Sequence, residues 1–184
     1  MIPHASTAID TFWHAACAAT GIPADARRHA LPFVEFSGDD SAEMLQIIDD
    51  IAEMAVQGLK RGTCHLAMQF DRDRVPMRQL GDYWIVVRTD GTPVCVVQVI
   101  AIEILPFDRV GPVFAASEGP EDGGLPTHAN WSALHREYFQ EQCARWGIGY
   151  RDDLPVVCES FITVYSPTMP WGRGGVGAGK GAAA

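Results

Sequence analysis

The sequence predicts a single α+β domain, a small, bent barrel of mostly antiparallel strands with flanking helices. Three observations predict it. Apolar residues recur at helical spacing up to Gly58, strand-like runs follow from Thr63, and Asp90-Gly91 marks a hairpin between two of those runs. Antiparallel strands with helices to one side give an α+β fold, and closing so small a sheet removes its unpaired edges.

Two helices are expected before the strands. Each has a capping pair at its start and a glycine at its end: Thr7 and Asp10 with Gly21, then Asp40 and Glu43 with Gly58. Between them, residues 22–30 are expected to form a connector and residues 31–36 a short extended segment.

The strands are expected at residues 63–70, 83–88, 93–105 and 155–165, where Val, Ile and aromatic residues gather. The third run is long, so it is expected to bend or to serve two parts of the sheet. Residues 71–80 read as a polar loop and residues 112–118 as one helical turn. Asn130 is the expected cap of a helix over residues 131–146. The domain therefore spans residues 1–166, followed by a flexible Gly- and Ala-rich tail at 167–184.

Composition and charge exclude several classes of protein. The 184 residues are 47% hydrophobic and carry a formal charge of −9, which argues against indiscriminate nucleic-acid binding. No apolar run reaches the roughly 18 residues of a membrane span, and residues 1–10 lack the features of a signal peptide. Five scattered cysteines without a CxxC pair predict reduced, mostly buried thiols in a cytoplasmic protein. No cofactor and no metal are predicted.

The charge is unevenly placed along the chain. Residues 35–53 carry seven acidic and no basic residues, whereas residues 58–88 carry six basic and three acidic ones. A local basic cleft would favour a small anionic ligand or a short nucleic-acid segment, and solvated loop charges are the alternative.

Lys60 and Thr63 are the first candidates for chemistry. They follow the helix stop at Gly58 on a tight turn into a strand, so an amine and a hydroxyl can converge on one site. Threonine needs a nearby base to act as a nucleophile, and a lysine can be that base or can stabilise an oxyanion. The alternative is a solvated lysine and an ordinary first residue of a strand.

The second candidates lie in the acidic, glycine-rich loop at residues 118–126. Glu118 and Glu121 are carboxylates that can move protons there, or they can belong to an exposed acidic turn. Trp131 and His135 share one helix face. His128 lies nearby, so the alternatives are a metal site and aromatic packing with a satisfied histidine. Tyr83 and Trp131 can stack a nucleobase or belong to the core. The common phosphate-loop, dinucleotide, serine-hydrolase and zinc-protease motifs are missing from the sequence.

The ordered set of motifs resembles the ASCH-domain family, which is related to the PUA-like RNA-binding barrels. The resemblance covers about residues 12–165. Its motifs are Phe12-Trp13, Phe36-Ser-Gly-Asp39, Gly58-Leu-Lys60-Arg-Gly-Thr63, Leu80-Gly81-Asp82-Tyr83, Pro106-Phe107, Ala116-Ser-Glu118-Gly119, Trp131 with His135 and Phe139, and Val156-Val-Cys-Glu159-Ser-Phe161.

The resemblance implies a cleft beside the G-x-K-x-x-T turn and RNA, nucleosides or nucleotides as ligands. Some relatives are ribonucleases, and small ones are N4-acetylcytidine amidohydrolases that use a Lys, a Thr and a Glu. It thus implies a possible hydrolase with Lys60, Thr63 and Glu118 as catalytic residues, and Glu121 as the rival carboxylate. Arg61, Tyr83, Glu121, Trp131 and His135 are the expected substrate contacts. Pro120 stands where relatives often carry a second Glu. A non-catalytic RNA- or nucleotide-binding module is the alternative. The sequence indicates no membrane partner and no DNA specificity, and it leaves the oligomeric state open.

Overall fold

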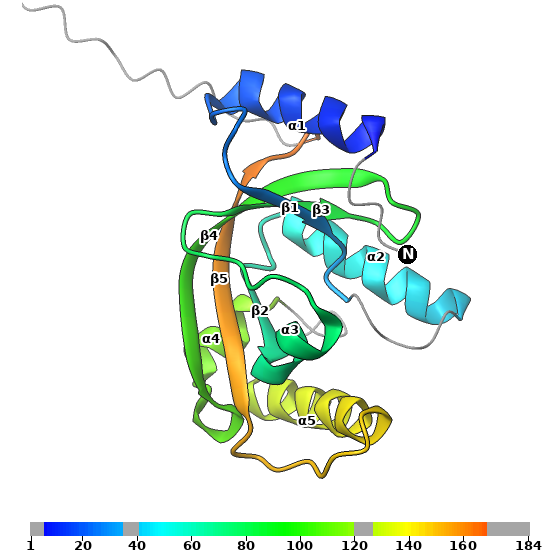
Figure 1. Cartoon of the computed structure of the whole chain (residues 1–184), viewed down its shortest axis with the longest axis vertical. Helices are drawn as coiled ribbons and strands as arrows, with labels where there is room; N and C mark the ends of the chain where they lie inside the picture. The colour runs from blue at the N-terminus through cyan, green and yellow to red at the C-terminus, as the bar shows by residue number, and fades with distance from the viewer. Residues whose placement is uncertain (1–5, 35–40, 120–126, 169–184) are drawn as a thin grey trace, which may run out of the picture.

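The structure is a computed structural model that describes residues 6–34, 41–119 and 127–168. In chain order its elements are α1 (Thr7–Thr20), β1 (Arg28–Leu31), α2 (Ala42–Val56), β2 (Gly62–Leu66), α3 (Ala67–Asp73), β3 (Tyr83–Val87), β4 (Pro93–Pro106), the 3-10 turn η1 (Phe107–Arg109), α4 (Pro112–Ser117), α5 (His128–Arg145) and β5 (Pro155–Tyr165). Figure 1 shows α1 at one end of the sheet and α5 at the other, with α2 beside the sheet.

The five strands form one sheet in the order β1-β3-β4-β5-β2. Only the β1–β3 pair is parallel, and the other three pairs are antiparallel. The predicted α+β class, with mostly antiparallel strands and flanking helices, is confirmed. The predicted barrel takes the form of a small curled sheet that does not close, because β1 and β2 remain its two edges among the described strands.

The curl of the sheet comes from β4, the long strand at the left of Figure 1. Its first part pairs with both β3 and β5, and from Val99 onward it pairs with β5 alone. The β4–β5 register shifts between Val96 and Val97 and again between Val99 and Ala101. Such bulges bend a strand and increase its twist. The expectation that this strand serves two parts of the sheet is therefore confirmed.

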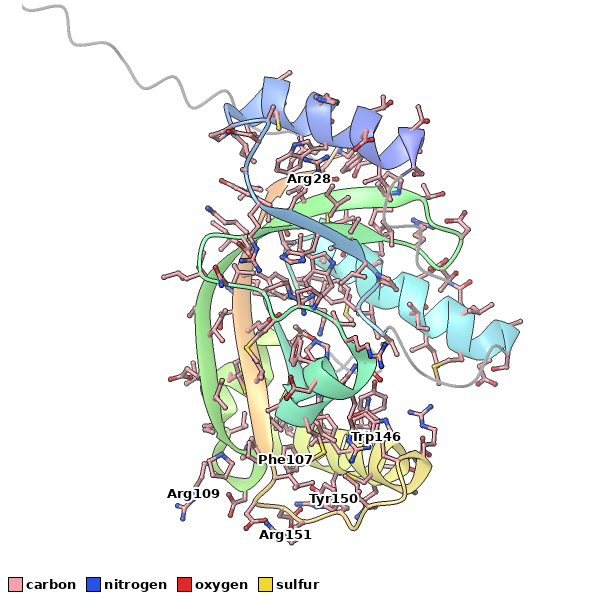
Figure 2. All side chains as sticks on the ribbon, viewed as in Figure 1. Arg28, Phe107, Arg109, Trp146, Tyr150 and Arg151 are labelled. Atoms are coloured by element: carbon pink, nitrogen blue, oxygen red, sulfur yellow. The ribbon has the colours of Figure 1, made fainter. Side chains whose placement is uncertain are left out.

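Three tryptophans lie at the centres of three apolar clusters. Trp13 of α1 packs on β3 and the end of β5, Trp84 packs between the sheet and α2, and Trp131 packs between α4, α5 and the β2 end of the sheet. All three are at most 1% exposed. Figure 2 shows Phe107 among the side chains between the sheet and α5, where its ring contacts that of Trp131. Arg109 and Arg151 point away from the same end of the molecule.

The helix boundaries follow the predicted stops more closely than the predicted caps. Gly21 and Gly58 have φ of 79° and 71° and follow the helices that they were expected to end. Ser6 caps α1 by accepting from the Ile9 N–H, and Ser41 caps α2. Asp40, the cap predicted for the second helix, lies outside the described residues. Thr127 caps α5, so that helix begins three residues before the predicted start.

The predicted bounds of one strand and of one extended segment were wrong. The strand expected at 63–70 ends at Leu66, and Ala67–Asp73 form α3. Leu66 is opposite Val156 in the sheet, so the next partner is Pro155, which has no N–H to donate. The extended segment expected at 31–36 is β1 at Arg28–Leu31, because its register is set by parallel pairing with β3.

All five cysteines are free, and four of them are buried. No helix in the described ranges is long and apolar enough to cross a membrane. The predicted tail lies outside the described residues from Met169 onward.

Candidate active site

The turn between α2 and β2 holds Lys60 in place through its backbone. The N–H groups of Leu59 and Lys60 both donate to the carbonyl of Met54, at 2.9 and 3.1 Å. Arg61 then donates to the carbonyl of Ser117, at 2.6 Å, and its own carbonyl accepts from Phe161. The turn is therefore tied to α2, to the end of α4 and to β5 at once. These contacts fix the direction in which the Lys60 side chain leaves the chain.

A close approach of two backbones brings Glu118 to this turn. Gly62 begins β2 beside α4, and a Cβ at Gly62 would collide with the Ser117 side chain. Gly119 has φ of 99° and packs against Met54 and the turn. Only glycine suits both positions, one for space and the other for its left-handed conformation. Glu118, which lies between Ser117 and Gly119 in the chain, therefore enters the site from the end of α4.

Lys60 and Glu118 form a buried ion pair. The Lys60 Nζ donates to the Glu118 Oε2 at 2.8 Å and also lies 3.5 Å from the Glu118 carbonyl oxygen. The two residues are 6% and 9% exposed. The other carboxylate oxygen, Oε1, lies 3.5 Å from the His135 Nε2 and accepts no hydrogen bond within the described part of the chain. Burial raises the pKa of the Glu118 carboxyl, but Lys60 and His135 lower it more, so it lies well below its usual range.

A second polar group lies on β2 and β5. The Thr63 Oγ1 is 3.4 Å from the His65 Nε2, which is also 3.5 Å from the Arg78 Nη2. Arg78 donates from Nε to the Glu159 Oε2 at 2.7 Å, and its guanidinium lies 4.0 Å above the Trp84 ring. All four polar residues of the group, Thr63, His65, Arg78 and Glu159, are buried.

His65 is held neutral, and this has a consequence for stability. Burial and the neighbouring Arg78 guanidinium lower the pKa of His65 to about 3, against an ordinary value of 6.5. Between these values the unfolded chain binds the extra proton and the folded chain does not. The free energy of unfolding should therefore fall as the pH drops below 6.5, by up to about 1.4 kcal/mol per pH unit.

Urea unfolding at pH 7 and at pH 5 tests this expectation. The wild type should lose about 2 kcal/mol more between the two conditions than a His65→Gln variant, which cannot take up the proton. Glu118 contributes little to the loss between pH 7 and pH 5. Its lowered pKa affects the free energy of unfolding mainly below the ordinary pKa of a carboxyl group. Equal losses in the two proteins would contradict the buried neutral state of His65.

The Lys60–Glu118 pair and two members of the second group, Thr63 and His65, line one cavity of about 660 Å³. This volume is in the usual range for small-molecule sites. The Lys60 Nζ lies 5.2 Å from the centre of the Phe33 ring, which forms part of the wall. The lining combines a polar set with apolar walls from α2, α5 and the segment after β1: Phe33, Val34, Ile47, Asp50, Ile51, Met54, Lys60, Thr63, Cys64, His65, Glu118, Gly119, Leu134, His135 and Tyr138.

The structure brings four of the predicted site residues together: Lys60, Thr63, Glu118 and His135 all line the cavity. The others lie elsewhere. Arg61 is exposed beside the turn. Tyr83 packs against Trp13 on the side of α1. Trp131 is 1% exposed, and His135 stacks on it at 4.3 Å, so Trp131 supports the site from the core. Glu121 lies outside the described residues.

Sequence reasoning missed several residues of the site. His65 had a usable signal, because it is two positions after Thr63 on one strand and so faces the same side. Glu159 lies opposite Thr63 in the sheet. No local sequence pattern predicts its pairing with Arg78. Phe33 and Tyr138 reach the cavity from segments far apart in the chain, again without a sequence signal.

The basic residues of 58–88 do not form one cleft. Lys60 and Arg78 are paired with buried carboxylates. Arg88 lies 3.4 Å from Glu53, and Arg72 packs over the Trp146 ring. Within the described ranges no group of three or more His, Cys, Asp or Glu side chains is placed to hold a metal ion. Among the described lining residues Lys60 is the one Lys or Arg side chain, and the Glu118 carboxylate neutralises it.

Comparison with known proteins places this fold. The model of the ASCH domain family matches residues 39–165. The fold is similar to the crystal structure of the ASCH domain from Lactobacillus crispatus JV V101, with a TM-score of 0.63 and 28% identity, covering 76% of this chain and 80% of that one. It is also similar to protein EF3133 from Enterococcus faecalis V583, with a TM-score of 0.69 and 20% identity over 88% and 95% of the two chains. The second likeness concerns the fold alone. No curated protein matches the sequence.

The curled mixed sheet with its flanking helices is thus the PUA-like fold, an RNA-binding class of fold. The chain belongs to the ASCH-domain family.

Proposed function

We propose that this protein is an amidohydrolase that acts on an N-acylated nucleoside of the N4-acetylcytidine type. The observation that carries the proposal is the buried Lys60–Glu118 pair in a cavity that Thr63 also lines. This arrangement supplies an amine, a carboxylate and a hydroxyl around one ligand-sized space. Acyl transfer needs a base, an acid and a nucleophile.

The ion pair can supply both the base and the acid. Transfer of one proton from the Lys60 ammonium to the Glu118 carboxylate gives a neutral amine beside a neutral acid. A ligand that fills the cavity removes water and so penalises the charged form of the pair. The Lys60 amine then takes the Thr63 proton while Oγ1 attacks the acyl carbon. Glu118 gives its proton to the leaving amine, the C–N bond breaks, and the pair is charged again.

The second half of the reaction hydrolyses the Thr63 ester. A water molecule attacks the acyl carbon and gives up one proton to the same pair. The bond between the carbonyl carbon and Oγ1 then breaks, and the pair returns that proton to Oγ1. The carboxylic acid leaves, and the site regains its starting protonation.

The charge of the cavity favours a nucleoside over an RNA strand. In the part of the lining that the structure describes, Lys60 is the one Lys or Arg side chain, and Glu118 neutralises it. Asp50 adds a carboxylate at the α2 wall, and His65 is neutral. Phosphate groups are bound by unpaired Lys and Arg side chains, so this lining suits an uncharged ligand. Ribonuclease chemistry would require further unpaired cations beside the site, and the described lining residues include no Lys or Arg besides Lys60.

Incubation with N4-acetylcytidine, with its 5′-monophosphate and with a short single-stranded RNA, read by mass spectrometry, tests the proposal. We expect loss of the acetyl group from the nucleoside, slower reaction of the monophosphate and intact RNA. A Lys60→Ala variant should lose the activity by about 100-fold or more. Cleaved RNA would assign the site to ribonuclease chemistry. Binding without any turnover would make the protein a recognition module. Full activity of Lys60→Ala would contradict catalysis by Lys60, Thr63 and Glu118.

A further inference from the structure

Apart from Thr63, the residues of the second polar group have no part in the proton transfers described above. The group is nevertheless buried and ordered into a chain of contacts, from Glu159 through Arg78 and His65 to Thr63. Buried polar groups of this kind are costly unless they are paired. Its last member is the proposed nucleophile, so the chain ends at the reacting atom.

Arg78 is held at three points. Its Nε donates to Glu159, its planar face lies on Trp84, and its Nη2 lies 3.5 Å from His65. Trp84 is itself fixed, because its indole N–H donates to the Leu31 carbonyl at 2.8 Å. A guanidinium has only donors, and its fork is rigid. Arg78 therefore presents an N–H to the His65 Nε2 and cannot accept from it.

This contact decides which nitrogen of His65 carries the hydrogen. If Nε2 faces a donor, it must be the acceptor, so the ring hydrogen lies on Nδ1. The same Nε2 is 3.4 Å from the Thr63 Oγ1. In the resting site the Thr63 hydroxyl can then donate to Nε2, which holds Oγ1 in place. The hydroxyl hydrogen turns from Nε2 to the Lys60 amine when Lys60 takes it.

We propose that Arg78 is a positioning residue that fixes His65 as a neutral acceptor with its hydrogen on Nδ1, and that His65 in turn orients the Thr63 hydroxyl. The inference rests on the proposed function, since it assigns Thr63 as the attacking group. His65 is then not the general base, because a protonated imidazole would place a second positive charge beside Arg78, which is unfavourable. Lys60 remains the base.

The surroundings of His65 agree with this role. Arg78 in the loop before β3, Lys60 before β2 and the His135 ring on α5 all lower its pKa, whereas Glu118 after α4 raises it. Glu159 on β5 balances Arg78 directly. From α3 the ring meets only the edge of Phe70 among the described ring contacts. Cations thus dominate the electrostatic surroundings of the imidazole.

Two substitutions at His65 separate an acceptor from a base. In His65→Gln the amide oxygen can replace Nε2 as an acceptor, but it cannot take a proton. We expect kcat for N4-acetylcytidine within about threefold of the wild type in His65→Gln and at least about tenfold lower in His65→Leu. Equal, large losses in both variants would show that His65 acts as a base and would overturn the inference.

Nitrogen-15 NMR of the histidine rings gives a readout that does not depend on activity. The His65 signal, assigned by its loss in His65→Gln, should show the hydrogen on Nδ1 and no titration between about pH 5 and 8. The double variant Arg78→Met with Glu159→Gln removes both charges together. There the hydrogen should be shared between Nδ1 and Nε2, and the pKa of His65 should rise.

Arg27→Met is the matched control for the NMR experiment. It removes another arginine that touches this loop, through the Met77 carbonyl and Asp82, without contact to His65. Its His65 signal should match that of the wild type. A wild-type hydrogen on Nε2, or an unchanged His65 signal in the double variant, would overturn the inference. If the protein instead turns over no substrate but shows the expected NMR pattern, the proposed function fails and the positioning by Arg78 stands.

Discussion

Replacing Thr63 with valine is expected to lower turnover of N4-acetylcytidine by at least about 1,000-fold, because loss of a nucleophile removes the covalent route. Valine has nearly the shape of threonine and keeps the β-branch, so β2 and the cavity wall should be preserved. Binding of the nucleoside should change little, since the hydroxyl contributes one hydrogen bond at most. The measurement is kcat by product formation, with Kd by calorimetry.

Thr63→Ser is the matched control for this variant. It retains a hydroxyl at the same place and should keep turnover within about 100-fold of the wild type. A Thr63→Val protein that turns over as fast as Thr63→Ser would contradict the assignment of Thr63 as nucleophile. In that case a water molecule would have to attack the acyl carbon directly.

Replacing Arg78 with methionine is expected to lower the free energy of unfolding by about 3–5 kcal/mol, the usual cost of leaving one buried charge without its partner. Glu159 is 0% exposed, and its Oε2 accepts from Arg78 at 2.7 Å. Without Arg78 the carboxylate must either stay charged in the core or take up a proton. The loss is measured by urea unfolding at pH 7.

Two comparisons separate this effect from a general one. The double variant Arg78→Met with Glu159→Gln should recover at least half of the loss, because no unpaired charge remains. Arg136→Met removes a pair with Asp152 of similar length, 2.9 Å, whose side chains are 42% and 52% exposed. It should cost no more than about 1 kcal/mol. Equal losses in Arg78→Met and Arg136→Met would contradict a buried pair at Arg78.

Much of the element order could be predicted from local patterns. The helical stops at Gly21 and Gly58, the hairpin at Asp90-Gly91 and the closing strand all depend on neighbours within a few residues. The errors lie where contacts with distant segments of the chain set the bounds of a strand. The strand after Thr63 ends early because Pro155 lies across from it, and β1 is a strand because β3 lies beside it.

The candidate site divides in the same way. Lys60 and Thr63 were identified by the short turn that carries them, and His65 follows from the alternation along β2. Glu118 and Glu121 were both candidates because they lie in the acidic, glycine-rich loop, and the family resemblance favoured Glu118. Spacing along the chain does not choose between them, because the choice depends on how closely α4 packs against β2. Tyr83 and Trp131 were plausible stacking residues by type, but packing places both against the core.

The sequence by itself determined the α+β class, most of the succession of helices and strands and the pair of residues on the turn after α2, because these depend on local periodicity and backbone conformation. Only the tertiary structure decided which carboxylate meets Lys60, since Glu118 is 58 positions away. It also decided that Arg78 and Glu159, 81 positions apart, form a second buried pair behind Thr63. Both pairs exist because the fold buries their charges away from water, and a buried charge needs an opposite partner.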